Sequence, residues 1–356
     1  MSSTLPILEW YQQNKRDLPW RNTKNPYFIW LSEVILQQTR VDQGLPYYLL
    51  FIKQYPTIKK LAAASDDDVM KLWQGLGYYN RAKNMLETAR IIVKELNGTF
   101  PTTYVELLKL KGIGPYTAAA IASFAYNEPK AVVDGNVFRV LSRVFAVAEP
   151  INSTKGKQIF AELAQELLDK KHPAQYNQAI MELGATVCKP TTPNCIICVI
   201  NAKCLAFDQQ KMLEFPVKLK KQKPKERFLH FFFIEQNKKT YLYQRKKERI
   251  WHNLFEPPFV EVQTFIEGET IFEKNEVKML LGKYFSVERS FSTKHQLTHQ
   301  TIFAQFWIVQ VPSIFTMDSS YISVEIASIS MFAVHRLFDK FWEFYKLNPV
   351  RSTFMG

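Results

Sequence analysis

The chain has 356 residues, more than one compact core usually holds, so its length predicts two domains. Lysine and arginine number 46 against 33 aspartate and glutamate, and the resulting net charge of +13 indicates a polyanionic partner, nucleic acid ahead of membrane. A generally basic surface would give the same total, and no apolar run is long enough to cross a bilayer.

The start of the chain, residues 1–17, does not have the pattern of a signal peptide. Charged and amide side chains such as Glu9, Gln13 and Arg16 interrupt its apolar residues. We therefore expect an intracellular, cytoplasmic protein in a reducing compartment, and we expect it to act as a monomer.

The first two hundred residues predict a helical domain. Tyr27–Thr39 carries apolar residues at helical spacing, and the segments beginning at Val137 and Ile159 repeat the pattern. No alternating strand pattern lies between them. The fold class expected for residues 1–206 is therefore all-α.

Glu33 is unusual because it lies inside an otherwise apolar helical stretch. Trp30 and Gln37 are expected one turn away on the same face. A carboxyl group in such surroundings should have a raised pKa and keep its proton near neutral pH. A solvent-facing helix glutamate is the alternative.

Leu110–Thr117 predicts a hairpin between two helices. Gly112 and Gly114 precede Pro115 at the expected first turn of a helix over Thr117–Ala125. The unpaired backbone N–H groups at such a helix start suit an anion, and a DNA phosphate would fit. An ordinary glycine turn is the alternative for these residues taken alone.

Asp134 follows in Val-Val-Asp-Gly-Asn-Val, where the chain enters the next helix. By itself it could simply cap that helix.

All four cysteines, Cys188, Cys195, Cys198 and Cys204, lie in one short loop. A disulfide-rich secreted protein would spread them along the chain, whereas one loop suits a metal centre. Their spacing, C-x6-C-x2-C-x5-C, favours a [4Fe–4S] cluster over structural zinc, which prefers paired C-x2-C knuckles.

The amino-acid composition and the hydrophobic pattern change after the cysteine loop. Residues 207–226 contain many lysines and two prolines, which predicts a linker that could also touch phosphate. Strand-like runs follow at 228–234, 240–245 and 301–311, with helical stretches around 272–284 and 334–345. Residues 227–356 therefore predict an α+β domain.

Together, the hairpin, the Val-Asp-Gly-Asn-Val segment and the cysteine loop resemble the helix-hairpin-helix superfamily of DNA glycosylases. Within it, three further segments are similar to the MutY family of adenine DNA glycosylases, which act in base-excision repair. These segments are Leu18-Pro19-Trp20-Arg21, Ser32-Glu33-Val34-Ile35-Leu36-Gln37-Gln38-Thr39 and Gly75-Leu76-Gly77-Tyr78-Tyr79.

The resemblance implies two helical lobes with the active site between them, one lobe holding a [4Fe–4S] cluster. It implies that Glu33 is the general acid and Asp134 the catalytic carboxylate, the glycosidase combination of one neutral and one charged carboxyl group. The implied partner is double-stranded DNA with adenine opposite 8-oxoguanine or guanine, the adenine being flipped into a pocket. The implied substrate and DNA contacts are Arg21, Gln38, Leu76, Tyr78, Gly112 and Gly114, although Tyr78 and Tyr79 could instead pack in the core.

Tyr116 distinguishes members of the superfamily. Relatives that also cut the strand, such as endonuclease III, carry a lysine there, whose amine forms a Schiff base with the sugar. Tyrosine cannot, so we expect a monofunctional glycosylase that leaves an abasic site. The alternative is a bifunctional pyrimidine glycosylase and lyase; a non-enzymatic DNA-binding protein is disfavoured by the two carboxyl groups.

The second domain resembles the Nudix-like domain with which MutY recognises 8-oxoguanine. Trp251–Pro258 replaces the glutamate-rich helix that Nudix hydrolases need for magnesium, so we expect no hydrolase activity. Leu297, Thr298 and His299 match the family's Phe-Ser-His recognition loop, with leucine in place of phenylalanine. His299 could alternatively be an ordinary strand residue.

Overall fold

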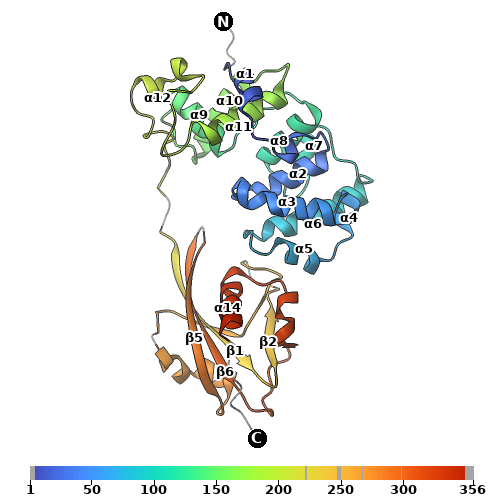
Figure 1. Ribbon diagram of the computed structural model, residues 1–356, viewed down its shortest axis with the longest axis vertical. Coiled ribbons are helices and arrows are strands. Elements are labelled where there is room, and N and C mark those ends of the chain that lie inside the picture. The colour runs from blue at the N-terminus through green and yellow to red at the C-terminus, as the bar shows by residue number, and fades with distance from the viewer. Residues whose placement is uncertain (1–4, 221–222, 247–249, 267, 298, 349–356) are drawn as a thin grey trace. The chain divides into compact units, whose positions relative to one another are not determined.

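The computed structural model describes residues 5–220, 223–246, 250–266, 268–297 and 299–348. The chain divides into two compact units (Figure 1). One contains residues 1–63 and 84–221, and the other contains residues 64–83 and 222–356. Residues 64–83, which lie within the segment 1–206 predicted to be helical, group with residues 222–356, and Lys71, Gln74 and Tyr79 donate hydrogen bonds to that part of the chain.

The described residues of the first unit form helices joined by loops and contain no strand, in agreement with the predicted fold class. Its helices are α1 (Leu8–Asn14), η1 (Pro19–Arg21), α2 (Pro26–Leu36), α3 (Val41–Gln54), α4 (Ile58–Ala62), most of α6 (Asn80–Glu95), α7 (Tyr104–Leu107), α8 (Pro115–Tyr126), α9 (Gly135–Val144), α10 (Thr154–Leu167), α11 (Pro173–Thr186), η2 (Asn201–Lys203) and α12 (Leu205–Asp208). A continuous core joins α1, α9, α10 and α11 to the cysteine loop.

Local sequence explains where the helices that carry the site begin. Helix α8 starts at Pro115 after an extended Gly114, as predicted, and ends at Tyr126, followed by Asn127 in the left-handed conformation with φ of 58°. Helix α9 starts after Asp134, whose side chain caps it. Proline at the first position and a carboxylate cap both fit the unpaired N–H groups of a helix start.

Helix α2 ends earlier than the sequence predicts. It stops at Leu36, because Gln37 has ψ of 116° and Gln38 a positive φ of 58°. Gln37 therefore does not share a helical face with Glu33, and its Nε2 donates instead to Thr117 Oγ1 at 3.3 Å.

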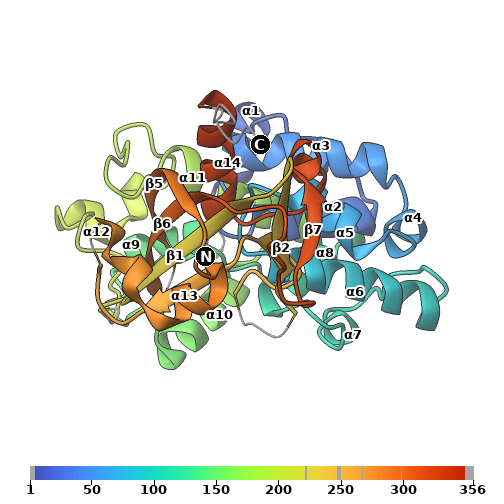
Figure 2. The ribbon, with the colours of Figure 1, turned by 90° about the horizontal axis from the view of Figure 1, so that it is seen from below.

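The second unit is α+β, as predicted, with two sheets (Figures 1 and 2). The four-stranded sheet has the order β4-β1-β6-β5, with β1 and β6 parallel and the other neighbours antiparallel. The three-stranded sheet has the order β3-β2-β7. The strands are β1 (Lys225–Glu235), β2 (Lys239–Gln244), β3 (Phe255–Glu256), β4 (Phe259–Val262), β5 (Ser286–Gln296), β6 (Gln300–Gln310) and β7 (Ile322–Glu325).

The helical segments of this unit are α5 (Asp66–Trp73), the start of α6, η3 (Gly268–Glu273), α13 (Asn275–Leu281), η4 (Ile326–Met331) and α14 (Arg336–Leu347). The three strands and two helices predicted from sequence are thus confirmed as β1, β2, β6, α13 and α14. Among the residues described, no helix has the length and apolar character needed to cross a membrane.

Aromatic rings hold α14 against the four-stranded sheet. Phe231 on β1 lies opposite Phe306 on β6, and their rings stack with centroids 4.6 Å apart. Phe341 of α14 stacks on Phe306 at 4.7 Å. Stacked and buried rings of this kind bring large apolar area into the core, so α14 is firmly seated on the sheet.

Candidate active site

A cavity of about 520 Å³ opens in the helical unit, within the size range of about 300–1,000 Å³ typical of ligand sites. Its walls come from η1, α2, α8, α11 and the start of α9. The ionisable residues among its lining include Arg16, Arg21, Glu33, Tyr116, Asp134 and Glu182. Three of the residues singled out in the sequence as catalytic, far apart along the chain, therefore meet at one cavity.

Glu33 is buried, with 7% of its surface exposed, which rules out the solvent-facing alternative. The hydroxyl of Tyr116, from the first turn of α8, donates to Glu33 Oε2 at 2.6 Å. Burial raises the pKa of Glu33 to about 7, although the hydrogen bond from Tyr116 favours the charged form. This carboxyl group can hold a proton near neutral pH, as the sequence predicted.

Asp134 both caps α9 and lines the cavity. Its Oδ1 accepts from the backbone N–H groups of Asn136 at 2.9 Å and Val137 at 2.8 Å, and its Oδ2 accepts from Asn136 Nδ2 at 2.7 Å. Burial raises the pKa of Asp134, while these hydrogen bonds oppose the increase. The helix N-terminus further favours a negative charge at this position.

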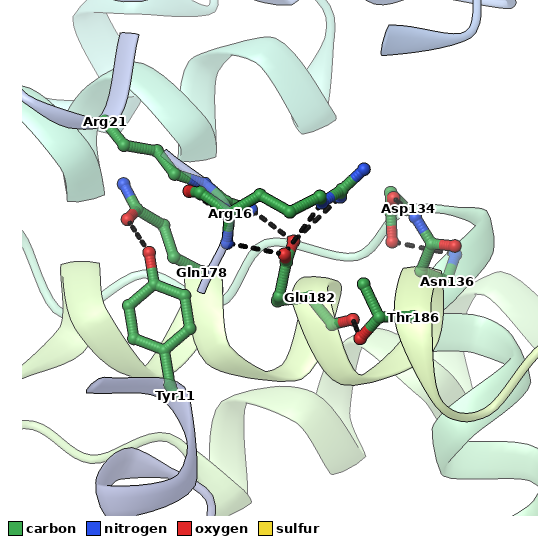
Figure 3. Close-up of polar contacts among 8 residues, drawn as sticks. All are labelled: Tyr11, Arg16, Arg21, Asp134, Asn136, Gln178, Glu182 and Thr186. Atoms are coloured by element: carbon green, nitrogen blue, oxygen red, sulfur yellow. Dashed lines mark hydrogen bonds and ion pairs between the residues drawn. The ribbon is translucent and has the colours of Figure 1, made fainter. Parts of the chain in front are cut away.

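Glu182 of α11 is a site residue that sequence reasoning missed. Its fully buried carboxylate accepts from Arg16 Nε at 2.8 Å and from Arg21 Nη2 at 2.6 Å (Figure 3). Burial opposes its ionisation, but the hydrogen bonds from Arg16 and Arg21 lower the pKa of Glu182 to about 2. Glu182 thus holds Arg21, a predicted pocket residue, against the cavity wall.

The signal that could have found Glu182 is the one that singled out Glu33, a glutamate inside an apolar helical stretch. Arg139, also missed, lines the cavity and donates through Nη2 to Asn136 Oδ1 at 2.8 Å and through Nε to the carbonyl of Cys188 at 2.7 Å. It connects the Asp134 turn to the cysteine loop.

The predicted hairpin is present and exposed between α7 and α8. Gly112 has a positive φ of 76°, and a Cβ there would lie 2.9 Å from Asn84 Cβ. Both the backbone conformation and the lack of space therefore favour glycine at this position. Gly114 caps α8 and Pro115 begins it, and both residues are exposed.

The four cysteines line a single cavity beside α9. Arg143, which is 2% exposed, donates from Nη1 to Cys188 Sγ at 3.3 Å and to the carbonyl of Lys189 at 2.8 Å. Among the described residues, no three side chains of His, Cys, Asp or Glu converge closely enough to hold a single metal ion.

The other residues predicted to contact DNA do not line the active-site cavity. Gln38 is a residue just beyond α2, at a positive φ. Leu76 is buried, whereas Tyr78 is 53% exposed with a positive φ of 50°, so Tyr78 is not a core residue. His299 is exposed in the turn between β5 and β6 rather than within a strand, and Thr298 lies outside the described residues.

Comparison with known proteins agrees with this architecture. Residues 31–168 match the HhH-GPD superfamily base excision DNA repair protein family. An adenine DNA glycosylase of Buchnera aphidicola subsp. Baizongia pistaciae is 35% identical over 308 residues, 85% of each chain. The adenine DNA glycosylase of Mus musculus is 45% identical over 212 residues, 57% of this chain and 41% of that protein.

Solved structures show the same fold for the helical part. A thermostable thymine-DNA glycosylase is 28% identical, with a TM-score of 0.53, covering 57% of this chain and 94% of that chain. An endonuclease III–DNA complex is 20% identical with a TM-score of 0.50, covering 57% of this chain and 94% of that chain, which supports the fold alone.

The paired carboxyl groups, the hairpin and the matched family define a base-excision DNA repair glycosylase of the helix-hairpin-helix class. The similarity to the curated relatives identifies the family within this class. With one of them matched over 85% of both chains, this chain belongs to the adenine DNA glycosylase family.

The environment of Glu33 predicts a pH dependence for base release. If its protonated form is the active one, the rate constant should fall as pH rises through about 7, by about tenfold per unit beyond. Tyr116→Phe removes the hydrogen bond that favours the charged form, so the alkaline limb should move to higher pH. Single-turnover rates measured from about pH 5 to about pH 9, which brackets the range in which such groups titrate, would show it.

Tyr126→Phe, at the other end of α8, is the matched control, because its hydroxyl bonds only the carbonyl of Phe100 among the contacts described. Its profile should follow that of the wild type. An unchanged alkaline limb in Tyr116→Phe would show that Glu33 does not set it.

Proposed function

We propose that the protein releases adenine from double-stranded DNA in which adenine lies opposite 8-oxoguanine or guanine, hydrolysing the N-glycosidic bond and leaving an abasic site. The observation that supports this most is the pair of carboxyl groups at one cavity, Glu33 with a pKa near 7 and Asp134 hydrogen-bonded at a helix start. These are the acid and the carboxylate that glycosidic cleavage requires.

Glu33 is the proposed acid. The adenine must leave the base stack and enter the cavity before its bond to the sugar is exposed. Tyr116 holds Oε2 of Glu33, so the proton is available from Oε1 toward N7 of the adenine. Protonation neutralises the base as it departs with the electron pair of the glycosidic bond, which lowers the barrier.

Asp134 is the proposed stabiliser of the sugar. Loss of the base leaves positive charge on C1′ and the ring oxygen, and an ionised carboxylate stabilises that charge or bonds C1′ transiently until water attacks. Its bonds to Asn136 and Val137 fix its position and favour ionisation.

Tyr116 supports a monofunctional reaction over the endonuclease III-like alternative. Its phenol lies at the cavity in hydrogen-bond contact with Glu33, and it has no amine to form a Schiff base with the opened sugar. The strand should therefore remain uncut at the abasic site.

Contacts with DNA are assigned to residues outside the cavity. The turn at Gly112 and Gly114, just before α8, has backbone N–H groups suited to a phosphate, and Gln38 and Tyr78 are suited to the bases near the mispair. In the Nudix-like C-terminal domain, the sequence segment Leu297, Thr298 and His299 is the proposed reader of 8-oxoguanine. We expect the protein to act on DNA as a cytoplasmic monomer.

Cys188, Cys195, Cys198 and Cys204 are the proposed ligands of a [4Fe–4S] cluster. A cube binds each thiolate to a different iron, so its ligands need not converge on one point, and the four thiols share a cavity without doing so. The buried guanidinium of Arg143 beside Cys188 suits the negative charge of a thiolate-bound cluster. When bound, the cluster would fix the cysteine loop against α9.

The central test is base release by the full chain and by its carboxyl variants. The wild type should release adenine from duplexes with adenine opposite 8-oxoguanine. Asp134→Asn and Glu33→Gln should slow release by about 10²–10⁴-fold while retaining duplex affinity. Asparagine caps helices as well as aspartate does, so Asp134→Asn should keep α9 intact. Near-normal single-turnover rates in either variant would remove that residue from the mechanism.

Tyr116→Lys tests the monofunctional assignment. The introduced amine should give borohydride-trappable crosslinks to DNA carrying the mispair, and the wild type should give few. Abundant crosslinks with the wild type would mean that another amine acts as a lyase.

Metal analysis tests the cysteine cavity. Purified protein should be yellow-brown and contain about four iron atoms and about four acid-labile sulfides per chain. Colourless protein with a stoichiometric amount of zinc and full activity would replace the cluster with a structural zinc ion.

A further inference from the structure

The segment that carries Tyr78 is bonded to the C-terminal domain within the second unit. Lys71 Nζ donates to the carbonyl of Phe332 at 3.2 Å, Gln74 Nε2 donates to Asp339 Oδ1 at 3.1 Å, and the hydroxyl of Tyr79 donates to the carbonyl of Val334 at 3.3 Å. All three acceptors lie between the end of η4 and the first turn of α14.

That receiving segment is itself held by buried groups. His335 caps α14 by accepting from the N–H of Phe338 at 3.2 Å, and its Nε2 lies 3.0 Å from Glu256 Oε2. Glu256 also pairs with Arg245, and the ring of Trp251 stacks on His335 with centroids 4.0 Å apart. Buried, well-bonded networks of this kind are stiff, so the acceptors stay in place.

The Tyr78 loop is also organised from within. Trp73 Nε1 donates to the carbonyl of Gly77 at 3.0 Å, and Arg81 Nη2 donates to the same carbonyl at 3.2 Å. The Arg81 guanidinium lies 5.6 Å from the Tyr78 ring centroid. A tyrosine with positive φ is uncommon and persists only where its surroundings fix it.

We propose that the segment 332–339 of the C-terminal domain positions Tyr78 for insertion into the duplex, with Asp339 as the positioning residue. The inference rests on the proposed function, in which Tyr78 contacts bases beside the mispair. It adds that the C-terminal domain contributes to mispair selection without touching the lesion. A ring held in its binding conformation loses less conformational entropy when it inserts between bases.

Asp339 is the residue to substitute, because it accepts the hydrogen bond through its side chain. The other two acceptors are backbone carbonyls, which a substitution does not remove. Asp339→Ala removes the acceptor for Gln74. Asp339→Asn keeps a carbonyl oxygen for Gln74 but removes the charge that pairs with Arg336. Glu343→Ala, an acid one turn further along α14 with its side chain 60% exposed, is the matched surface control.

The test is a double-mutant cycle on the full-length protein, combined with a DNA-side probe. Single-turnover release is measured for the wild type, Asp339→Ala, Tyr78→Ala and the double variant, with adenine opposite 8-oxoguanine. Asp339→Ala should slow release by about tenfold in the presence of Tyr78 and by less than about twofold in its absence, since contacting or jointly acting residues are not additive. Asp339→Asn and Glu343→Ala should behave like the wild type.

The probe is 2-aminopurine placed beside the mispair, whose fluorescence rises when an inserted ring unstacks it. The rise on binding should be reduced in Asp339→Ala and Tyr78→Ala and retained in the two controls. Equal slowing by Asp339→Ala with and without Tyr78, or an unchanged fluorescence rise, would overturn the inference. A wild type that releases no adenine would refute the proposed function instead, while the fluorescence comparison would still decide whether Asp339 positions Tyr78.

Discussion

Removing Glu33 from water is the physical constraint around which the helical unit is organised. A buried carboxyl group that is charged and unpaired destabilises the folded protein. The hydrogen-bond partner of Glu33 is a phenol rather than a cation, because the Tyr116 hydroxyl donates to it at 2.6 Å. A neutral donor satisfies one oxygen without forcing ionisation, so the pKa of Glu33 stays near 7. An arginine in this place would have left no proton to give.

Glu182 shows the opposite solution within the same cavity. It too is buried on an apolar helix, but Arg16 and Arg21 pair with it, and its pKa falls to about 2. The pKa of Glu33 is raised, chiefly by burial, whereas the pKa of Glu182 is lowered because the hydrogen bonds from Arg16 and Arg21 outweigh burial. Asp134 has a third environment, backbone N–H groups at the start of α9, which also explains why a capping residue can be a site residue.

The second unit includes residues 64–83 from the predicted helical part of the sequence. Residues 64–83 bond to the segment 332–339, so a chain truncated at the linker would leave α5 and the Tyr78 loop without these partners. Glu256, within Trp251–Pro258, is buried and paired with Arg245 and His335. That carboxylate serves the fold and also steadies the segment that receives the Tyr78 loop.

Much of this protein was determined by local sequence. Pro115 after Gly114, the capping Asp134 and the aromatic runs of β1 and β6 specify their elements within a few residues, because dihedral preference, capping and periodicity are local properties. Glu33 was marked by its apolar neighbours. The end of α2 at Leu36, the pairing of Glu182 with Arg16 and Arg21, and the attachment of residues 64–83 to α14 were not predictable in this way. The Glu182 ion pairs and the attachment of residues 64–83 to α14 depend on contacts between residues up to 265 positions apart. Only the packed tertiary structure brings such residues together.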